Sequence, residues 1–474
     1  MYRFIIAGVL FIALNTQAQD KPASVLTLKQ CVETGITNNL DVSVSGLQVK
    51  RNEVDWKQAK LNRWPSLAAL TNQGINQGRS IDPSTNDYIN ERVSFSDYSL
   101  FGDVVLFNGF SLQNNVKRTK LAVEASKMDY QQAKDDLAIN IILAYLLVLN
   151  NEDQLVQARN QADVSKKEMD RLTTMDQQGA IPPSQLADLK GQYANDQLSI
   201  INAETAVTTA KITLCQWMNV PYDPAMKLER LDAETAPGKN EITPDQLYAI
   251  AEKNFPLVKA TELRRQSAEK AIKAIKGELF PTLRLSANTS SYYYSSFQQV
   301  VGTSSSFQSS DDYVLVNGNP SAVVRKVNNV EYGKIRYGKQ LDNNLSSQVS
   351  LNLRIPIFNR LQVRNRVEQA RIQLKQEELT AKTTKTQLQQ NVHQAHVNVT
   401  SAADRLARLT EQVAAYNESF KAAVARFNAG VGTSNDYLIV KNNLDRANIN
   451  LINARYEIVL RTKVLDYYQG KPLY

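Results

Sequence analysis

The residues from Val349 to Gly430 constrain the fold more than any other part of the chain. Apolar and polar side chains alternate from Val349 to Ile357, the period of two that is typical of a strand with one apolar face. A run rich in Gln, Ala, Glu and Lys follows, with no Pro or Gly before Gly430, which predicts a helix of roughly 70 residues. A strand joined directly to so long a helix favours a rod or tube wall over a globule.

This stretch has a counterpart earlier in the chain, which indicates a tandem duplication. The residues that match without a gap are Tyr98 with Val349, Phe107-Asn108 with Phe358-Asn359, Gly179 with Gly430, and Ile201 to Ala203 with Ile452 to Ala454. Upstream, at a second constant offset, Thr27 matches Thr243 and Pro65 matches Pro281. Each half therefore predicts a helix of roughly 38 residues, two strands joined by a loop, the long helix, a turn and a helix of roughly 36 residues.

The expected domain organisation follows from this repeat. Residues 1–19 form a signal peptide, because Arg3, an apolar run and the small residues near Ala18 have the order of a secretory leader. Residues 20–219 are the first repeat, 220–241 a Pro-rich linker, and 242–474 the second repeat, which has the longer loop between its strands. Proline cannot continue a helix, so the helix-to-strand junctions are expected at Trp64-Pro65 and Phe280-Pro281.

No segment after the leader has the 18 or more apolar residues of a membrane-spanning helix. The nearest, Leu137 to Leu149, has the length of a buried core helix. If the chain enters a membrane, it must therefore do so as a closed barrel. Four strands per chain cannot close a barrel, so two copies with eight strands or three copies with twelve remain open at this point.

The sequence contains no convincing catalytic, cofactor-binding or metal-binding constellation. His393 and His396 share a helix face, but no Cys or carboxylate cluster accompanies them. The glycines at 333 and 338 imitate a P-loop without its Ser or Thr, and no helix is expected after them. Cys31 and Cys215 are expected to be unpaired. The charge of +8 is scattered among acidic residues, which argues against nucleic-acid binding.

Several segments resemble the TolC-type outer-membrane efflux proteins. They are LTLKQCVETGITNNL after the leader, DVVLFNG and LRIPIFN at the strand-to-helix junctions, and ARFNAGVGTSNDYLIVKNNL at the second turn. The resemblance implies a mostly α fold with a small β part, in which a duplicated long-helix α-barrel joins a twelve-stranded transmembrane β-barrel made by a homotrimer. It also implies a location in the outer membrane, extension into the periplasm, and partnership with a periplasmic adaptor protein and an inner-membrane RND or ABC transporter.

By the same resemblance, the two hairpin tips form the periplasmic entrance and meet the adaptor. The matching residues here are Gly179, Ala180, Ile181 and Pro182 in the first tip and Gly430, Val431, Gly432 and Thr433 in the second. The first tip departs from the family's Gly-rich form, which leaves open whether both tips dock equally. Asp436 matches a family Asp after the second turn, and either lines a gate or caps the helix.

The expected function is therefore a passive exit duct of a tripartite efflux or type I secretion system, for small molecules or polypeptides, with outer-membrane lipid as a further partner. No enzyme activity and no cofactor are expected. The alternative is a secreted or periplasmic coiled-coil structural protein that is not inserted in a membrane, although a plain coiled coil does not account for the alternating strands.

Overall fold

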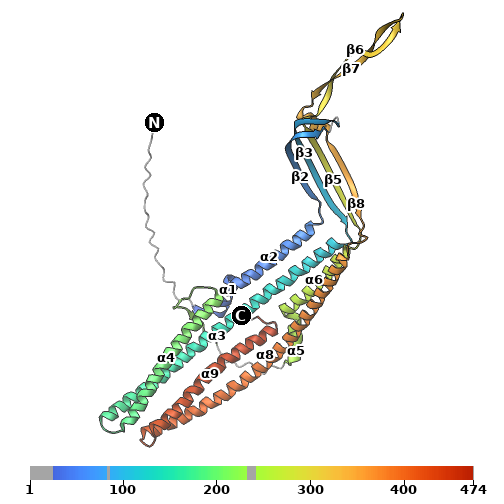
Figure 1. Cartoon of the computed structure of the whole chain (residues 1–474). Coiled ribbons are helices and arrows are strands. Elements are labelled where there is room, and N and C mark those ends of the chain that lie inside the picture. Colours follow the sequence, from blue (N-terminus) through green and yellow to red (C-terminus); the bar gives the residue numbers. More distant parts are fainter. Residues whose placement is uncertain (1–24, 83–85, 232–241, 473–474) are drawn as a thin grey trace, which may run out of the picture. The chain divides into compact units, whose positions relative to one another are not determined.

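The computed structural model of the chain describes residues 25–82, 86–231 and 242–472. The expected signal peptide and residues 232–241 of the expected linker lie outside this description. The described chain divides into two compact units, and each takes segments from both halves of the sequence (Figure 1). Unit 1 contains residues 25–51, 123–264 and 377–472, and unit 2 contains residues 52–122 and 265–376.

Helices make up most of unit 1. Several of them extend into unit 2, and their bounds are α1 Leu28–Asn38, α2 Leu40–Leu61, α3 Ser111–Gln177, α4 Pro183–Met218, α5 Pro244–Asn254, α6 Pro256–Gly277, α8 Gln362–Asn428 and α9 Ser434–Tyr468. The two long helices α3 and α8 have 67 residues each. This is close to the length that the absence of Pro and Gly predicts. Helices α4 and α9 have 36 and 35 residues.

The prediction of one continuous helix before each junction proline is wrong, because a single extended residue breaks the helix in both repeats. Asn39 (φ −66°, ψ 130°) separates α1 from α2, and its side-chain oxygen accepts hydrogen bonds from the backbone N–H groups of Asp41 and Val42. Phe255 (φ −65°, ψ 120°) separates α5 from α6. Pro256 excludes the helical conformation at Phe255, so the second break has a steric cause.

The largest apolar core of unit 1 lies around the middle of α3. Tyr145, Ile141 and Leu149 are buried there against residues of α1 and α4, as expected for the segment Leu137 to Leu149. The Tyr145 hydroxyl is placed to donate to the backbone oxygens of Leu26 and Glu229, at 3.1 and 2.6 Å. These contacts adjoin the short parallel pair of β1 (Val25–Leu26) and β4 (Lys227–Leu228). A second core joins α5, α8 and α9.

Unit 2 contains one antiparallel sheet with the strand order β2-β3-β5-β8. The strands are β2 Ser66–Ile81, β3 Tyr88–Phe107, β5 Thr282–Tyr294 and β8 Ser346–Arg354. Two strands thus come from each repeat, as expected, and β2 and β8 are left as open edges. The strand β8 ends before Ile355, earlier than the alternating pattern predicts, because Pro356 has no N–H group to donate.

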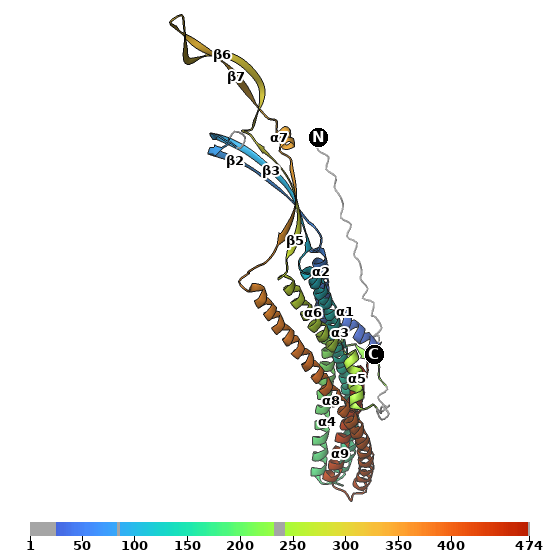
Figure 2. The same ribbon diagram turned by 90° about the vertical axis from the view of Figure 1, so that its right-hand side faces the viewer.

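The long segment between β5 and β8 is more ordered than the loop that the sequence predicts. It forms an antiparallel hairpin of β6 (Gln298–Val316) and β7 (Asn319–Lys334), followed by the short helix α7 (Tyr337–Asn343). Figures 1 and 2 show this hairpin projecting beyond one end of the four-stranded sheet. The expectation that no helix follows Gly333 is therefore wrong. Among the described residues, no helix has the length and apolarity needed to cross a membrane.

Candidate functional site

The first hairpin tip joins α3 to α4 through residues 178–182. Gly179 has φ +71°, and a Cβ added there would have no neighbour within 4 Å. The Ala180 N–H donates to the Met175 oxygen at 2.9 Å, which closes the end of α3. Pro182 precedes α4 without a side-chain cap, and Pro183 occupies the first helical position, where the missing N–H costs nothing.

The second hairpin tip joins α8 to α9 through residues 429–433. Gly430 has φ +73° and equally open surroundings. The N–H groups of Val431 and Gly432 both donate to the Arg426 oxygen, at 3.1 and 3.2 Å. Thr433 then caps α9. The two tips therefore share a left-handed glycine at the end of the long helix and differ in how the next helix starts.

Asp436 completes the cap of α9. Its carboxylate accepts hydrogen bonds from the Thr433 hydroxyl at 2.8 Å and the Thr433 N–H at 3.3 Å, while its own N–H donates to the Thr433 hydroxyl at 3.1 Å. The hydrogen bonds from Thr433, and then the nearby positive charge of Arg426, lower the pKa of this carboxyl group below its usual value. At neutral pH the carboxylate is charged, so this reciprocal cap is complete.

The substitution Thr433→Ala is expected to destabilise the start of α9 by about 1 kcal/mol, because two of these hydrogen bonds are lost. Amide hydrogen exchange in the first turn of α9 should become faster, while exchange in the first turn of α4, which has no side-chain cap, should not change. The contribution of Asp436 should be present above the ordinary Asp pKa of about 4 and disappear as the pH falls through its lowered pKa. Exchange that is unaffected by Thr433→Ala at neutral pH would contradict this assignment.

The two tips lie side by side at one end of unit 1 (Figures 1 and 2). A buried cluster, here called the tip cluster, joins them and consists of Leu172, Leu186, Leu189, Phe427 and Tyr437. The rings of Phe427 and Tyr437 stack with their centroids 5.2 Å apart. Burial raises the pKa of the Tyr437 hydroxyl. The Ser434 hydroxyl donates to the Asp188 carboxylate at 2.9 Å, which adds a polar contact between the tips.

A buried charged group lies one to two helical turns beyond the tip cluster. The side chain of Lys441 is 2% exposed, and its ammonium contacts the carboxylates of Asp196 at 3.0 Å and Asp445 at 2.7 Å. Asp196 also accepts hydrogen bonds from Ser165 and Gln192. The ammonium therefore links α9 to α4, and the hydrogen bond from Ser165 links Asp196 to α3. Sequence reasoning missed this group, because the repeat aligns Lys441 with Lys190, which is exposed.

A groove lies beside the second tip. It has a volume of about 330 Å³ and runs between α8 and α9, where small residues such as Ala422, Ala423 and Gly432 keep the two helices' side chains from filling it. Arg426 and Asp436 give it one positive and one negative group, and Val431 nearby is 72% exposed. The groove is therefore open, is lined partly by small side chains and carries both a positive and a negative group.

The expected junction residues occupy equivalent places in the two repeats. The Trp64 N–H donates to the Leu61 oxygen at 2.8 Å, and the Phe280 N–H donates to the Gly277 oxygen at 3.0 Å. The strands β2 and β5 begin immediately after Pro65 and Pro281. The residues Trp64 and Phe280 are 72% and 55% exposed. Both therefore present aromatic side chains at the start of the sheet.

The four strands hold their apolar residues in register. One row across the sheet runs from Leu67 through Gly102 and Ala287 to Val349. Two further rows on the same face pair Leu285 with Leu351 and Leu283 with Leu353. The alternate row contains Ser66, Asp103, Ser286 and Ser350, and Asp103 forms an ion pair with Arg284 at 2.6 Å. In these rows one face of the sheet is thus apolar and the other polar, as in a strand layer between lipid and an aqueous lumen. Farther along β2 and β3, Leu70 and Phe101 lie on the same face as Ser66 and Asp103.

The described residues contain little that could bind a metal ion. No group of three or more His, Cys, Asp and Glu side chains in this part of the chain is placed to hold a metal ion. His393 has one acidic neighbour, Asp245, with 3.5 Å between Nε2 and the carboxylate. Cys31 and Cys215 are free and buried.

Comparisons with known proteins agree with this geometry. The sequence model of the outer membrane efflux protein family matches residues 32–220 and 247–466. The chain is 20% identical to the outer membrane efflux protein BepC of Brucella suis over 383 residues, which cover 79% of this chain and 74% of BepC. The crystal structure of the outer membrane protein VceC from Vibrio cholerae is similar, with a TM-score of 0.75 and 12% identity over 94% of this chain and 97% of VceC. The outer membrane channel CmeC of Campylobacter jejuni has the same TM-score and identity and is covered to 85%.

Proposed function

The chain belongs to the outer membrane efflux protein family, and from this premise we propose that its two hairpin tips form the periplasmic entrance of an efflux channel and dock an adaptor protein. The family membership confirms the function as an outer-membrane efflux channel and the location in the outer membrane with extension into the periplasm. The matches to solved structures confirm the expected fold class. The coiled-coil alternative has no comparable support.

Three copies close the channel in this proposal. The strands β2 and β8 are open edges in one chain, and an edge strand in lipid must pair with another strand. With four strands from each copy, three copies give the twelve strands that the family resemblance implies. Each repeat supplies two of the four strands. The repeats are residues 20–219 and 242–474, with the linker 220–241 between them.

The observation that carries the tip assignment is the way the two turns are exposed. Both glycines adopt a left-handed conformation with open space around the position of a Cβ, yet the helices behind them are fixed by the tip cluster. Such an end is rigid in its core and accessible at its surface, which suits a docking site. The groove beside the second tip supports the adaptor contact there, with Gly430, Val431, Gly432 and Thr433 as contact residues.

The first tip, with Gly179, Ala180, Ile181 and Pro182, forms a second and weaker docking surface. Pro182 and Pro183 replace the capped turn, and Ile181 packs against the tip cluster rather than remaining free. Asp436 lines the entrance, and its hydrogen bonds in the cap of α9 hold its negative charge at a fixed position there. Energy for transport comes from an inner-membrane RND or ABC transporter, and the cargo is a small molecule or a polypeptide.

The substitution Gly430→Trp is expected to abolish adaptor copurification after crosslinking and to lower efflux about tenfold or more, because an indole would occupy the surface where the adaptor docks. Gly430→Asn is the matched control, since asparagine tolerates a positive φ without adding much bulk. It should retain both activities. Gly179→Trp places the same indole on the first tip, where a smaller loss is expected.

Outer-membrane levels of the heat-modifiable oligomer must be equal in the three variants for this comparison. Unchanged adaptor capture and efflux in Gly430→Trp would contradict the docking assignment. An equal loss in Gly179→Trp would contradict the proposed inequality of the two tips, but not the entrance itself.

A further inference from the structure

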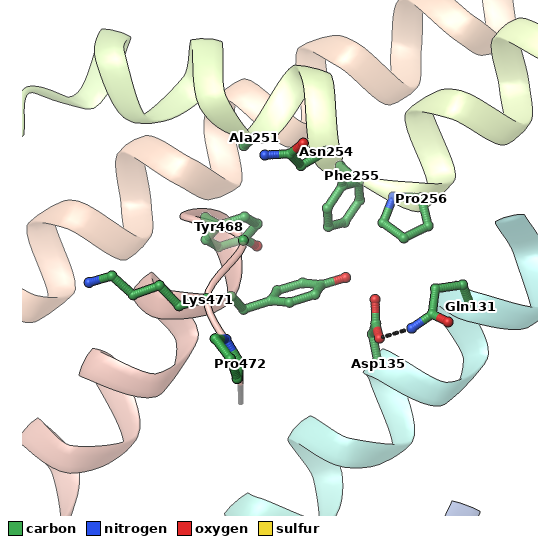
Figure 3. Close-up of a pocket in the computed structure, with 11 residues that line it drawn as sticks. Gln131, Asp135, Ala251, Asn254, Phe255, Pro256, Tyr468, Lys471 and Pro472 are labelled. Atoms are coloured by element: carbon green, nitrogen blue, oxygen red, sulfur yellow. Dashed lines mark hydrogen bonds between the residues drawn. The ribbon is translucent and has the colours of Figure 1, made fainter. Parts of the chain in front are cut away.

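A second concave site lies in unit 1, far along the chain from both hairpin turns. It is a pocket of about 620 Å³ between the end of α9, the break between α5 and α6, and the middle of α3 (Figure 3). This volume is within the range of pockets that bind small ligands. Neither the tip residues nor the junction residues line it, so the proposed function leaves it unexplained.

Aromatic rings form one part of its wall. Phe255 lies 5.5 Å from Tyr467 and 6.1 Å from Tyr468, and the two tyrosine rings lie 5.5 Å apart, all measured between ring centroids. The Phe255 ring reaches the pocket because Phe255 is the extended residue between α5 and α6. In the first repeat the aligned residue is Asn39, whose side chain caps α2 and donates to the Trp217 oxygen at 3.3 Å. The aromatic wall therefore belongs to the second repeat.

A carboxylate faces these rings from α3. Asp135 is half-buried and accepts a hydrogen bond from Gln131 at 2.7 Å (Figure 3). Within the described residues it has no cationic partner at ion-pair distance. Burial is the main reason that the pKa of Asp135 is raised, and the negative charge of Asp136 adds to it, while the Gln131 hydrogen bond and the positive charge of Lys134 act in the opposite direction. A half-buried carboxylate that lacks an ion-pair partner is stabilised when a cation binds beside it.

The two nearby lysines make their direct contacts with groups other than Asp135. Lys134 lies over the Tyr130 ring, 4.1 Å from its centroid. Lys471 is on the pocket wall, but its ammonium lies 3.2 Å from Asp466 and its side chain points away from Asp135 (Figure 3). The helix α9 ends at Tyr468 in the wall, and the partial negative charge of a helix C-terminus adds to the negative potential.

We propose that this pocket binds a small organic cation, an ammonium group attached to an apolar body, with Asp135 as the counter-ion and Phe255, Tyr467 and Tyr468 as the aromatic wall. The faces of aromatic rings attract ammonium groups, and quaternary ammonium ions are the ligands that aromatic cages recognise. A carboxylate on the opposite wall adds charge, which distinguishes this pocket from an apolar one that accepts neutral molecules.

The test uses the purified full-length oligomer in detergent and benzyltrimethylammonium as the probe, with binding measured by calorimetry and by ligand-observed NMR. Benzenesulfonate, an aromatic anion of similar size, is the ligand control. Benzyltrimethylammonium should bind, and benzenesulfonate should not. In Asp135→Asn the affinity for the cation should fall about tenfold or more, which corresponds to about 1.4 kcal/mol. Phe255→Leu should also weaken binding while leaving the carboxylate in place.

Asp136→Asn is the matched control, because it removes the same charge from the adjacent position of α3, outside the pocket lining. Its carboxylate acts on the pocket only from a distance, so Asp136→Asn should weaken binding clearly less than Asp135→Asn does. Equal losses in Asp135→Asn and Asp136→Asn, undiminished binding in Asp135→Asn, or equal binding of benzenesulfonate would each overturn the proposal, as would the absence of binding to the unmodified protein. Thermal melting of each variant verifies that it is folded. The readout is binding and not efflux, so this inference and the proposed function can fail independently.

Discussion

Replacing Lys441 with methionine is expected to destabilise the protein by about 3–5 kcal/mol, because it leaves the buried carboxylate of Asp196 and the half-buried carboxylate of Asp445 without their cation. Methionine fills much of the same volume, so the loss of stability reflects the missing positive charge and not the creation of a cavity. Asp196 and Asp445 would then face each other across the space between α4 and α9, next to the tip cluster. The measurement is the thermal unfolding of the purified oligomer, followed by circular dichroism, together with the fraction that resists dissociation in SDS.

The destabilisation should depend on pH in a defined direction. Burial already raises the pKa of Asp445, while Lys441 partly offsets that rise. Removing Lys441 raises it further above the unfolded value of about 3.9. A carboxyl group whose pKa is raised on folding favours the folded state at low pH and loses that advantage as the pH rises through the folded pKa. The gap between Lys441→Met and the unmodified protein should therefore be widest at neutral pH and narrow as the pH falls toward 4.

Two controls make this prediction specific. Lys190→Met changes the residue that the repeat aligns with Lys441, but its side chain is exposed, so stability should stay within about 0.5 kcal/mol. Adding Asp196→Asn and Asp445→Asn to Lys441→Met should recover part of the loss, since no buried charge remains. Equal stability of Lys441→Met and Lys190→Met at neutral pH would show that the buried ion pairs do not hold these helices together.

Periodicity and the repeat predicted the fold well because they depend on local chemistry that is present many times over. The absence of Pro and Gly from a helix and the alternation of residues in a strand are signals that extend over many residues. The helices α3 and α8 and the four sheet strands accordingly lie where they were expected. The short helix breaks were missed because each depends on one residue. Phe255-Pro256 carried a readable signal, since proline restricts the residue before it. Asn39 carried a weaker one, because an asparagine caps some helices and lies inside others.

The candidate sites were less predictable because they depend on which helices meet. Gly179 and Gly430 could be found from the end of each long helix, since a left-handed turn there requires such a residue. The burial of Lys441 could not be found in this way, because the aligned Lys190 is also a lysine but is exposed. The wall of the pocket beside Phe255 combines Asp135 with residues more than a hundred positions away, so only the folded chain brings them together.

The close approach of two glycines in unit 2 is another contact that one sequence does not reveal. Gly277 is the last residue of α6, and Gly109 lies between β3 and α3. A Cβ on Gly277 would lie 2.7 Å from the Gly109 oxygen and 2.9 Å from both the Ser111 N and Cβ. A Cβ on Gly109 would lie 2.3 Å from the Gly277 oxygen, and Gly109 also has φ +63°. The obstacles are mostly backbone atoms, which a side-chain rotation cannot move.

The substitution Gly277→Ala is therefore expected to destabilise unit 2 by about 1–3 kcal/mol and to lower the amount of oligomer that reaches the outer membrane. Helix propensity alone predicts the opposite sign, since alanine favours a helix over glycine by about 1 kcal/mol. Gly191→Ala tests that contrast, because Gly191 lies inside α4 with open space around its Cβ position. It should leave stability unchanged or raise it slightly. If Gly277→Ala matched Gly191→Ala in melting temperature and in outer-membrane level, the helix and the strand-to-helix link could not be in backbone contact at this point. A loss in Gly277→Ala alone would place the limit on close approach at the junction where the sheet meets the helices.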